Sequence, residues 1–211
     1  MRPENDPTGQ DGRSLSFIER ARRTQIIGAA AAVIAEEGIG QASLARIANQ
    51  AGVSKGVVSY HFSGKDELMT QVVVAVYEAG AHAMTPAIQA AATPRDRLAA
   101  YLRSNVAYIA ANPEALRAVI EIVSGYRPEG GGRLFEPGAD EPVAAFLVEL
   151  FRQGQKDGSF RDFDAEVMAH TVRAAIDTIA PRHALHPELD LMAYAEELVT
   201  LFDLATRGES P

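Results

Sequence analysis

Residues 43–65 read SLARIANQAGVSKGVVSYHFSGK and contain two short helical patterns separated by a glycine. Ser43 and Ser54 are predicted to be the N-caps of these helices, because serine side chains accept hydrogen bonds from the free N–H groups of a first helical turn. Gly52 lies between the two patterns and allows the sharp reversal of the backbone that a tight turn needs. A short helix, a tight turn and a second short helix are typical of a helix-turn-helix, whose second helix enters the major groove of DNA.

The second of these helices is predicted to have two different faces. At about 100° per residue, Val58 and Phe62 fall on one side and are expected to face the core. The opposite side carries Gly56, Tyr60 and Ser63, which are small or can form hydrogen bonds. Such residues suit close approach to a groove wall and hydrogen bonds to phosphate oxygens. An ordinary exposed surface helix is the alternative interpretation.

Positive charge is concentrated around this motif. The whole chain has a formal net charge of −8, yet residues 13–65 carry +4, while residues 1–12 carry −2 and residues 66–211 carry −10. A basic segment on an otherwise acidic protein indicates a local site for a polyanion, and the acidic remainder would disfavour unspecific binding to DNA. A random scatter of charges is the alternative.

The rest of the sequence predicts helices and no sheet. Apolar residues recur at steps of three and four, and glycines and prolines separate these patterns. We expect about nine helices, the first over residues 17–37 and the last over roughly residues 187–206. A helix that starts after Asp164 is expected to end at Pro181. Residues 1–14 have no periodicity and are predicted to form a disordered tail.

The sequence offers little support for an enzyme or a metal protein, the first alternative class. Cysteine is absent, which excludes disulfides and thiolate metal sites. The nucleophile elbow, the P-loop, the dinucleotide fingerprint and the His-Glu-x-x-His motif are also missing, so we expect no catalytic residue, cofactor or metal. His183 and His186 have a possible ligand spacing, but no acid accompanies them between Pro181 and Pro187. No secretory signal or membrane-spanning segment is recognisable, so we expect a cytoplasmic protein without a membrane partner.

Residues 46–68, RIANQAGVSKGVVSYHFSGKDEL, together with Ser43, resemble the DNA-binding signature of the TetR family of transcriptional regulators. In detail the segment is similar to the subgroup that includes the choline-responsive repressors of betaine synthesis. Residues 21–43 also fit the first helix of that family. The resemblance implies an all-α homodimer with a three-helix DNA-binding head over residues 15–63. A larger helical domain over residues 64–211 would bind a small effector and dimerise.

The family pattern implies a set of DNA contacts. Ser43 would meet a phosphate, Lys55 and Gly56 would lie at the groove, and Val57 would lie near base edges. Many members carry an aromatic residue where this chain has Ser59. The full set expected to bind DNA is Ser43, Arg46, Ser54, Lys55, Gly56, Val57, Ser59, Tyr60, His61 and Lys65.

The middle helices are expected to line a pocket for a small molecule, since polar and aromatic residues interrupt their apolar faces. Satisfied core groups or surface residues are the alternative. The candidate pocket residues are Tyr77, Tyr101, Asn105, Tyr108, Glu121, Tyr126, Arg173 and Asp177.

Dimerisation is expected on the helices over residues 142–156 and 164–180, whose apolar stripes are wide. The resemblance implies that these helices and their twins form a four-helix interface, whereas the alternative is that the stripes fill the core of their own domain. The candidate interface residues are Phe146, Leu147, Leu150, Phe151, Val172, Ile176 and Ile179.

Together these features predict a ligand-responsive regulator, most simply a repressor. It would bind a palindromic operator in double-stranded DNA as a dimer and release it when a small molecule fills the pocket. The long helix over residues 64–83 is the expected moving part, because it starts at the head and runs into the pocket region. A helical small-molecule-binding or scaffolding protein without specific DNA binding is the alternative.

Overall fold

The computed structural model describes residues 16–135 and 141–208 of the chain. Within these ranges the protein is built from ten helices, and the extended backbone amounts to one isolated bridge between Phe160 and Arg207. The predicted all-α class is therefore confirmed, whereas the tail predicted for residues 1–14 lies outside the described residues. The helices are α1 (Phe17–Glu37), α2 (Leu44–Gln50), α3 (Lys55–His61), α4 (Lys65–Ala90), α5 (Pro94–Ala111), α6 (Pro113–Gly125), α7 (Glu141–Lys156), α8 (Ala165–Asp177), α9 (Ile179–Leu185) and α10 (Leu191–Thr206).

Side-chain caps fix where the first helices begin. Ser16 and Glu19 form a reciprocal capping box at the start of α1, which satisfies two of the N–H groups that a helix leaves free. The predicted caps are confirmed as well, since Ser43 Oγ accepts from the Arg46 N–H and Ser54 Oγ accepts from the Val57 N–H. Gly52 has a φ of +65° in the turn between them, a conformation that side chains rarely adopt.

The predicted helix ends are wrong towards the C-terminus. Pro181 does not end a helix: α8 ends at Asp177, and Pro181 lies in the first turn of α9, where a missing N–H costs nothing. The last helix starts at Leu191, capped by Asp190, rather than near Pro187. Helix α4 extends past the expected residue 83 to Ala90.

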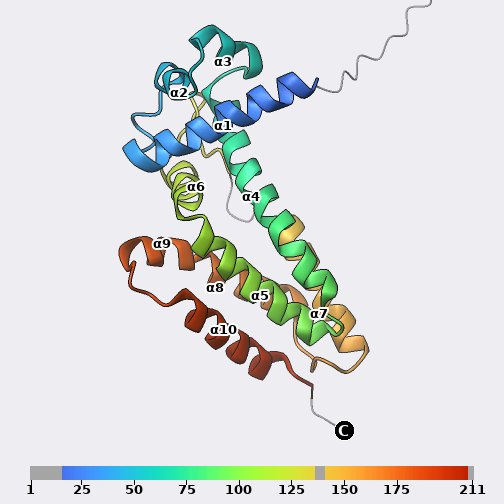
Figure 1. Cartoon of the computed structure of the whole chain (residues 1–211). Helices are drawn as coiled ribbons and strands as arrows, with labels where there is room; N and C mark the ends of the chain where they lie inside the picture. The colour runs from blue at the N-terminus through green and yellow to red at the C-terminus, as the bar shows by residue number, and fades with distance from the viewer. Residues whose placement is uncertain (1–15, 136–140, 209–211) are drawn as a thin grey trace, which may run out of the picture.

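Buried apolar side chains form two separate clusters. The head cluster joins α1, α2, α3 and the first half of α4, and includes Ile26, Ile34, Ile47 and Leu68. The body cluster joins α5, α7, α8, α9 and α10. Figure 1 shows α1 to α3 at one end of the molecule and α4 leading away from them towards α7. Helix α5 packs against α4 and also against α10. None of the described helices combines the length and the apolarity that crossing a bilayer requires.

Helix α6 belongs to the head cluster, although the sequence assigned it to the effector domain. Its residues Ala118, Val119 and Ile122 are buried with the side chains of α1 and α4. Its Leu116 packs instead against the body cluster, and the helix also contacts α9. Helix α6 is therefore a second connection between head and body, besides α4. The domain boundary predicted between residues 63 and 64 does not coincide with the division between the two clusters, because residues on both sides of it belong to the head cluster.

Candidate nucleic-acid interface and polar cluster

Helix α3 presents the two faces that its sequence predicts. Val58 is fully buried and Phe62 is 2% exposed, whereas the Tyr60 side chain is 76% exposed. Gly56 and Ser59 are exposed beside Tyr60, and α3 lies at the outer end of the head in Figure 1. The free face of α3 is thus open to a large ligand, with small residues that let its backbone approach closely.

Arg23 of α1 holds the C-terminal end of α3 in place. Its guanidinium donates to the His61 carbonyl, forms an ion pair with Glu67 Oε1 at 3.1 Å, and lies 4.3 Å from the centre of the Phe62 ring. Glu67 of α4 in turn accepts from the backbone N–H and the hydroxyl of Ser63, at 2.7 Å and 2.8 Å. One polar network therefore joins α3 to α1 and α4.

The same network lowers the pKa of the Glu67 carboxyl. The hydrogen bond from the Ser63 N–H is the largest cause, and the Ser63 hydroxyl and Arg23 act in the same direction against partial burial. In the sequence Arg23 is only one of several positive charges, since no periodic pattern links residues 44 positions apart. Its place beside Arg20 and Arg22 in the first third of α1 was the only available signal.

Arg46, one of the expected DNA contacts, is engaged within the protein. Its guanidinium lies 2.5 Å and 2.9 Å from Glu37 Oε1 and 3.3 Å from Gln50 Oε1. The bonds to Glu37 fasten α2 to the C-terminal end of α1. A direct contact between Arg46 and DNA stays a prediction, and it would have to replace the bond to Glu37.

The two lysines of the expected DNA-binding set differ in their surroundings. Lys55 is exposed at the start of α3, next to its cap Ser54. Lys65 is partly buried, and its ammonium lies 3.4 Å from the Ile39 carbonyl and 5.4 Å from the centre of the Tyr126 ring. Burial lowers the pKa of Lys65. In this conformation Lys65 therefore turns towards α6.

Four of the eight expected pocket residues form a polar cluster between α5 and α8. Arg173 donates to the Tyr101 hydroxyl at 3.2 Å and to Asp177 Oδ1 at 2.6 Å, and Asn105 donates to the Tyr101 carbonyl at 2.8 Å. Tyr101, Asn105 and Arg173 are all buried. Burial raises the pKa of the Tyr101 hydroxyl. The cluster therefore places the positive charge of Arg173, compensated by Asp177, inside the body. The centre of the Tyr101 ring lies 5.9 Å from that of the Phe146 ring.

Two further pocket candidates lie on α4 and against it. Tyr77 is half exposed on α4 and acts electrostatically on Arg173. The Tyr108 hydroxyl of α5 donates to the Val76 carbonyl at 2.9 Å. The Tyr108 ring covers Gly80, where an added Cβ would come within 3.1 Å of it. Tyr108 thus fixes the distance between α4 and α5.

The remaining two candidates, Glu121 and Tyr126, lie at the head. Glu121 Oε2 accepts from the Ile39 N–H at 3.5 Å, and the Tyr126 hydroxyl donates to Asp66 Oδ1 at 2.5 Å. Burial and the bond to Asp66 raise the pKa of the Tyr126 hydroxyl. The structure therefore does not bring the expected pocket residues together in one place.

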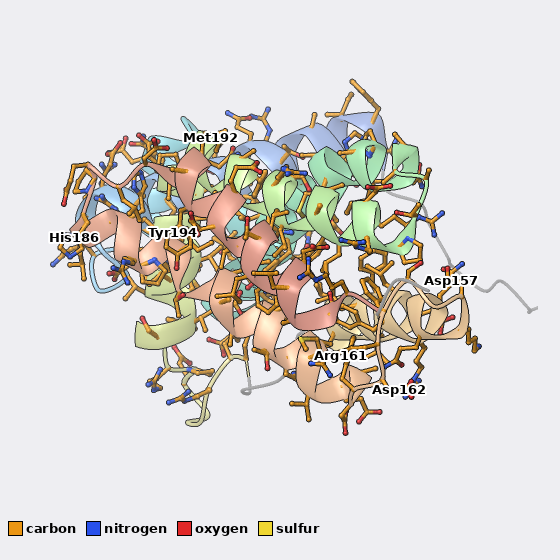
Figure 2. All side chains as sticks on the ribbon, turned by 90° about the horizontal axis from the view of Figure 1, so that it is seen from below. Asp157, Arg161, Asp162, His186, Met192 and Tyr194 are labelled. Atoms are coloured by element: carbon orange, nitrogen blue, oxygen red, sulfur yellow. The ribbon has the colours of Figure 1, made fainter. Side chains whose placement is uncertain are left out.

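An open groove of about 820 Å³ runs along α8 and α9. Asp177 is the one expected pocket residue among those lining it, with Ala174, Thr178, Pro181 and Leu185 supplying most of the remainder. His186, which also lines the groove, is the C-cap residue of α9 and lies at the edge of the molecule in Figure 2.

Six of the seven expected interface residues fill the protomer's own body cluster. Leu147, Leu150, Phe151, Val172, Ile176 and Ile179 are buried there. Phe146 alone is exposed, by 39%. The structure thus favours the alternative interpretation of these stripes. Other residues of the same region, such as Val167 of α8 and Leu185 of α9, are exposed apolar side chains.

Two family models match the chain. The model of bacterial regulatory proteins of the tetR family matches residues 26–72, and that of the BetI-type transcriptional repressor C-terminal domain matches residues 94–203. Among curated relatives, the regulator BetI of Rhizobium meliloti is 29% identical over 80% of each chain. BetI 1 of Chromohalobacter salexigens is 31% identical over 53% of this chain and 57% of that protein's length.

Solved structures show the same fold. The fatty acid degradation regulator FadR from Bacillus halodurans superimposes with a TM-score of 0.73 at 21% identity, over 85% of this chain and 97% of that one. A putative transcriptional regulator from Pseudomonas aeruginosa PAO1 gives a TM-score of 0.72 at 27% identity, over 93% of this chain and 97% of the other.

Proposed function

Because the chain belongs to the TetR family of bacterial regulatory proteins, with a C-terminal domain of the BetI type, we propose that it represses transcription by binding an operator through α2 and α3. It acts as a dimer in the cytoplasm, the compartment that holds bacterial DNA. Its function is to bind DNA and a small molecule, not to catalyse a reaction. The observation that carries this proposal is the two-faced α3, with Val58 and Phe62 in the core and Tyr60 largely exposed.

The exposed face of α3 suits the major groove. Gly56 and Ser59 let the backbone of α3 come close to the base edges, while Val57 offers an apolar side chain that can contact a thymine methyl group. Tyr60 and Lys55 donate to phosphates and fix the register of the helix on the duplex. The Arg23–Glu67 network keeps this face at a constant angle to α1 and α4.

A second copy would pack on the outer face of α8 and α9. Val167, Thr171, Ala174 and Thr178 are exposed and follow one another at steps of four, three and four along one face of α8 and its C-cap. The exposed Leu185 and the groove over α9 continue that face. This surface replaces the buried residues of the sequence prediction as the proposed interface, and a stable dimer requires on the order of 2,000 Å² of it in total.

The effector would act at the polar cluster of the body. A small molecule that inserts between α5 and α8 must rearrange the bonds of Arg173 with Tyr101 and Asp177. Helix α9 follows directly after α8 and packs against α6, which is part of the head core. Binding in the body can therefore favour a different head arrangement, and a coupling of about 1–3 kcal/mol would weaken operator binding about 5- to 150-fold.

The test is a titration of the chain with DNA from its own promoter and with a scrambled duplex of equal length, each at two salt concentrations. We expect tight binding to the promoter alone, weakened by salt because bound phosphates release counterions. Equal affinity for both duplexes would contradict the proposal, and would favour a ligand-binding protein without specific DNA recognition.

A further inference from the structure

Two residues that the sequence assigned to different sites are in contact. The sequence predicts that Lys65 binds DNA and that Tyr126 lines the effector pocket. In the structure the Lys65 ammonium lies over the Tyr126 ring and close to the Ile39 carbonyl. A cation within about 6 Å of a ring centre is attracted by the negative face of the ring. The C-cap residue of α6 therefore touches a candidate DNA contact directly.

Tyr126 is fixed firmly enough to hold Lys65. Its side chain is 8% exposed and its hydroxyl is bonded to Asp66, the neighbour of Lys65 in the chain. The preceding residue, Gly125, packs against Ile39, where an added Cβ would lie 3.3 Å from the Ile39 side chain. The Ile39 N–H is bonded to Glu121 of α6 and the Ile39 carbonyl accepts from Lys65, so both backbone polar groups of this residue have partners here.

The hold on Lys65 competes with DNA. One of the three N–H donors of the ammonium meets the Ile39 carbonyl, and the ring attracts its charge, so a phosphate beyond the reach of this position has to compete with both contacts for the side chain. Lys65 is the first residue of α4, where the free N–H groups of a long helix also favour an anion. The contacts with Tyr126 and Ile39 would thus oppose the movement of Lys65 to such a phosphate.

We propose that Tyr126 and the Ile39 carbonyl hold Lys65 away from the DNA backbone, so that the position of α6 sets how readily Lys65 binds phosphate. Tyr126 is then a positioning residue that acts through Lys65, not a residue of the effector pocket. This inference rests on the proposed function for its DNA-bound state. Since α6 also packs against α9, the body can influence one DNA contact without moving the whole head.

The first test follows Lys65 itself. The chain has three lysines, Lys55, Lys65 and Lys156, so reductive ¹³C-methylation, which preserves the charge, gives three side-chain signals besides the α-amino group. A Lys65→Arg variant identifies the Lys65 signal by its loss. In the free protein we expect this signal to be shifted upfield by the Tyr126 ring and to show an NOE to it. Promoter DNA should abolish both effects.

Two outcomes would overturn the proposal. The first is a Lys65 signal in the free protein that coincides with those of Lys55 and Lys156. The second is a Lys65 signal that keeps its ring shift when the promoter is bound. If no duplex binds, the proposed function fails, while the spectrum of the free protein still tests whether Tyr126 holds Lys65. The wild-type spectra suffice for these comparisons, even if a Tyr126 variant does not fold.

The second test is a double-mutant cycle on promoter affinity. Tyr126→Leu removes the ring, and we expect it to tighten promoter binding about 2- to 5-fold by releasing Lys65. In a Lys65→Gln background the same change should have no effect, and Lys65→Gln alone should reduce the salt dependence by about one phosphate contact per protomer. Tyr194→Leu, in a partly buried tyrosine of α10, is the matched control.

An equal effect of Tyr126→Leu in both backgrounds would show that Tyr126 acts through something other than Lys65. An unchanged salt dependence in Lys65→Gln would show that Lys65 meets no phosphate. Either result would overturn the inference, whereas an effect of Tyr126→Leu that disappears in the Lys65→Gln background, that is, a non-zero coupling energy, would support it.

Discussion

The hydroxyl of Tyr60 lies on the open face of α3, two residues from the fully buried Val58. Tyr60→Phe should weaken promoter binding about 5- to 30-fold, since it removes one hydrogen bond to a charged phosphate and leaves the packing of α3 intact. The loss should be similar for every duplex and should leave the salt dependence unchanged, because no cation is removed. Fluorescence anisotropy at several salt concentrations measures both quantities. Val57→Ala is the informative comparison, because it should change base preference instead.

Glu67 makes the stability of the head depend on pH. Its pKa is lowered from a usual 4.5, chiefly by the Ser63 N–H, so it contributes stability that is fully present above that value. This contribution is lost as the pH falls through the lowered pKa of the folded state. Glu67→Gln should therefore cost about 1 kcal/mol at pH 7 and progressively less below pH 4.5. Thermal melts of both proteins from pH 7 to pH 3 test this, with the exposed Glu78→Gln as control. A constant difference would contradict the assignment.

Single residues were predictable where a local pattern governs them. The burial of Val58 and Phe62 follows from helical periodicity, and the caps Ser43 and Ser54 follow from residue type and position. The partners of Arg23, Arg46 and Lys65 were not predictable, because these pairs join residues far apart in the sequence. The net charge of residues 13–65 shows that the segment is basic, but it does not show which of its cations bind to groups of the protein itself.

At the level of the helices, the outer face of α8 carries the dimer proposal. Ala174→Glu places a charge in the middle of the exposed row of Val167, Thr171, Ala174 and Thr178, where a partner would have to desolvate it. The variant should be monomeric at concentrations where the wild type is a dimer, with its helix content unchanged. Analytical ultracentrifugation and circular dichroism measure these properties. Ala83→Glu, also exposed but on α4, should remain dimeric; dissociation of both variants would contradict this interface.

Helix existence was predictable, but helix partners were not. Periodicity located α5, α6 and α7, yet the same apolar stripe can face its own core, a neighbouring domain or a second copy. Hence the stripes of α7 and α8 were assigned to an interface although they fill the body cluster, and α6 was assigned to the effector domain although it packs on α1. The end of α8 was wrongly placed at Pro181 for a simpler reason. Proline occurs both just after a helix and in the first turn of one, and the sequence does not distinguish the two positions.

For the molecule as a whole, two cores joined through α4 and α6 predict that the head can be reoriented while the body stays unchanged. Because the chain has no cysteine, a single Asn49→Cys on α2 or Lys156→Cys on α7 can carry a spin label in each protomer of the proposed dimer. Operator binding should narrow the Asn49 distance distribution, because successive major-groove faces lie one helical turn of about 34 Å apart. The Lys156 distance should not change, since that site belongs to the body. An Asn49 distance distribution that is identical with and without operator would mean that the orientation of the head is already fixed in the free protein. A parallel change in the Lys156 distance would mean that head and body move together as a rigid unit.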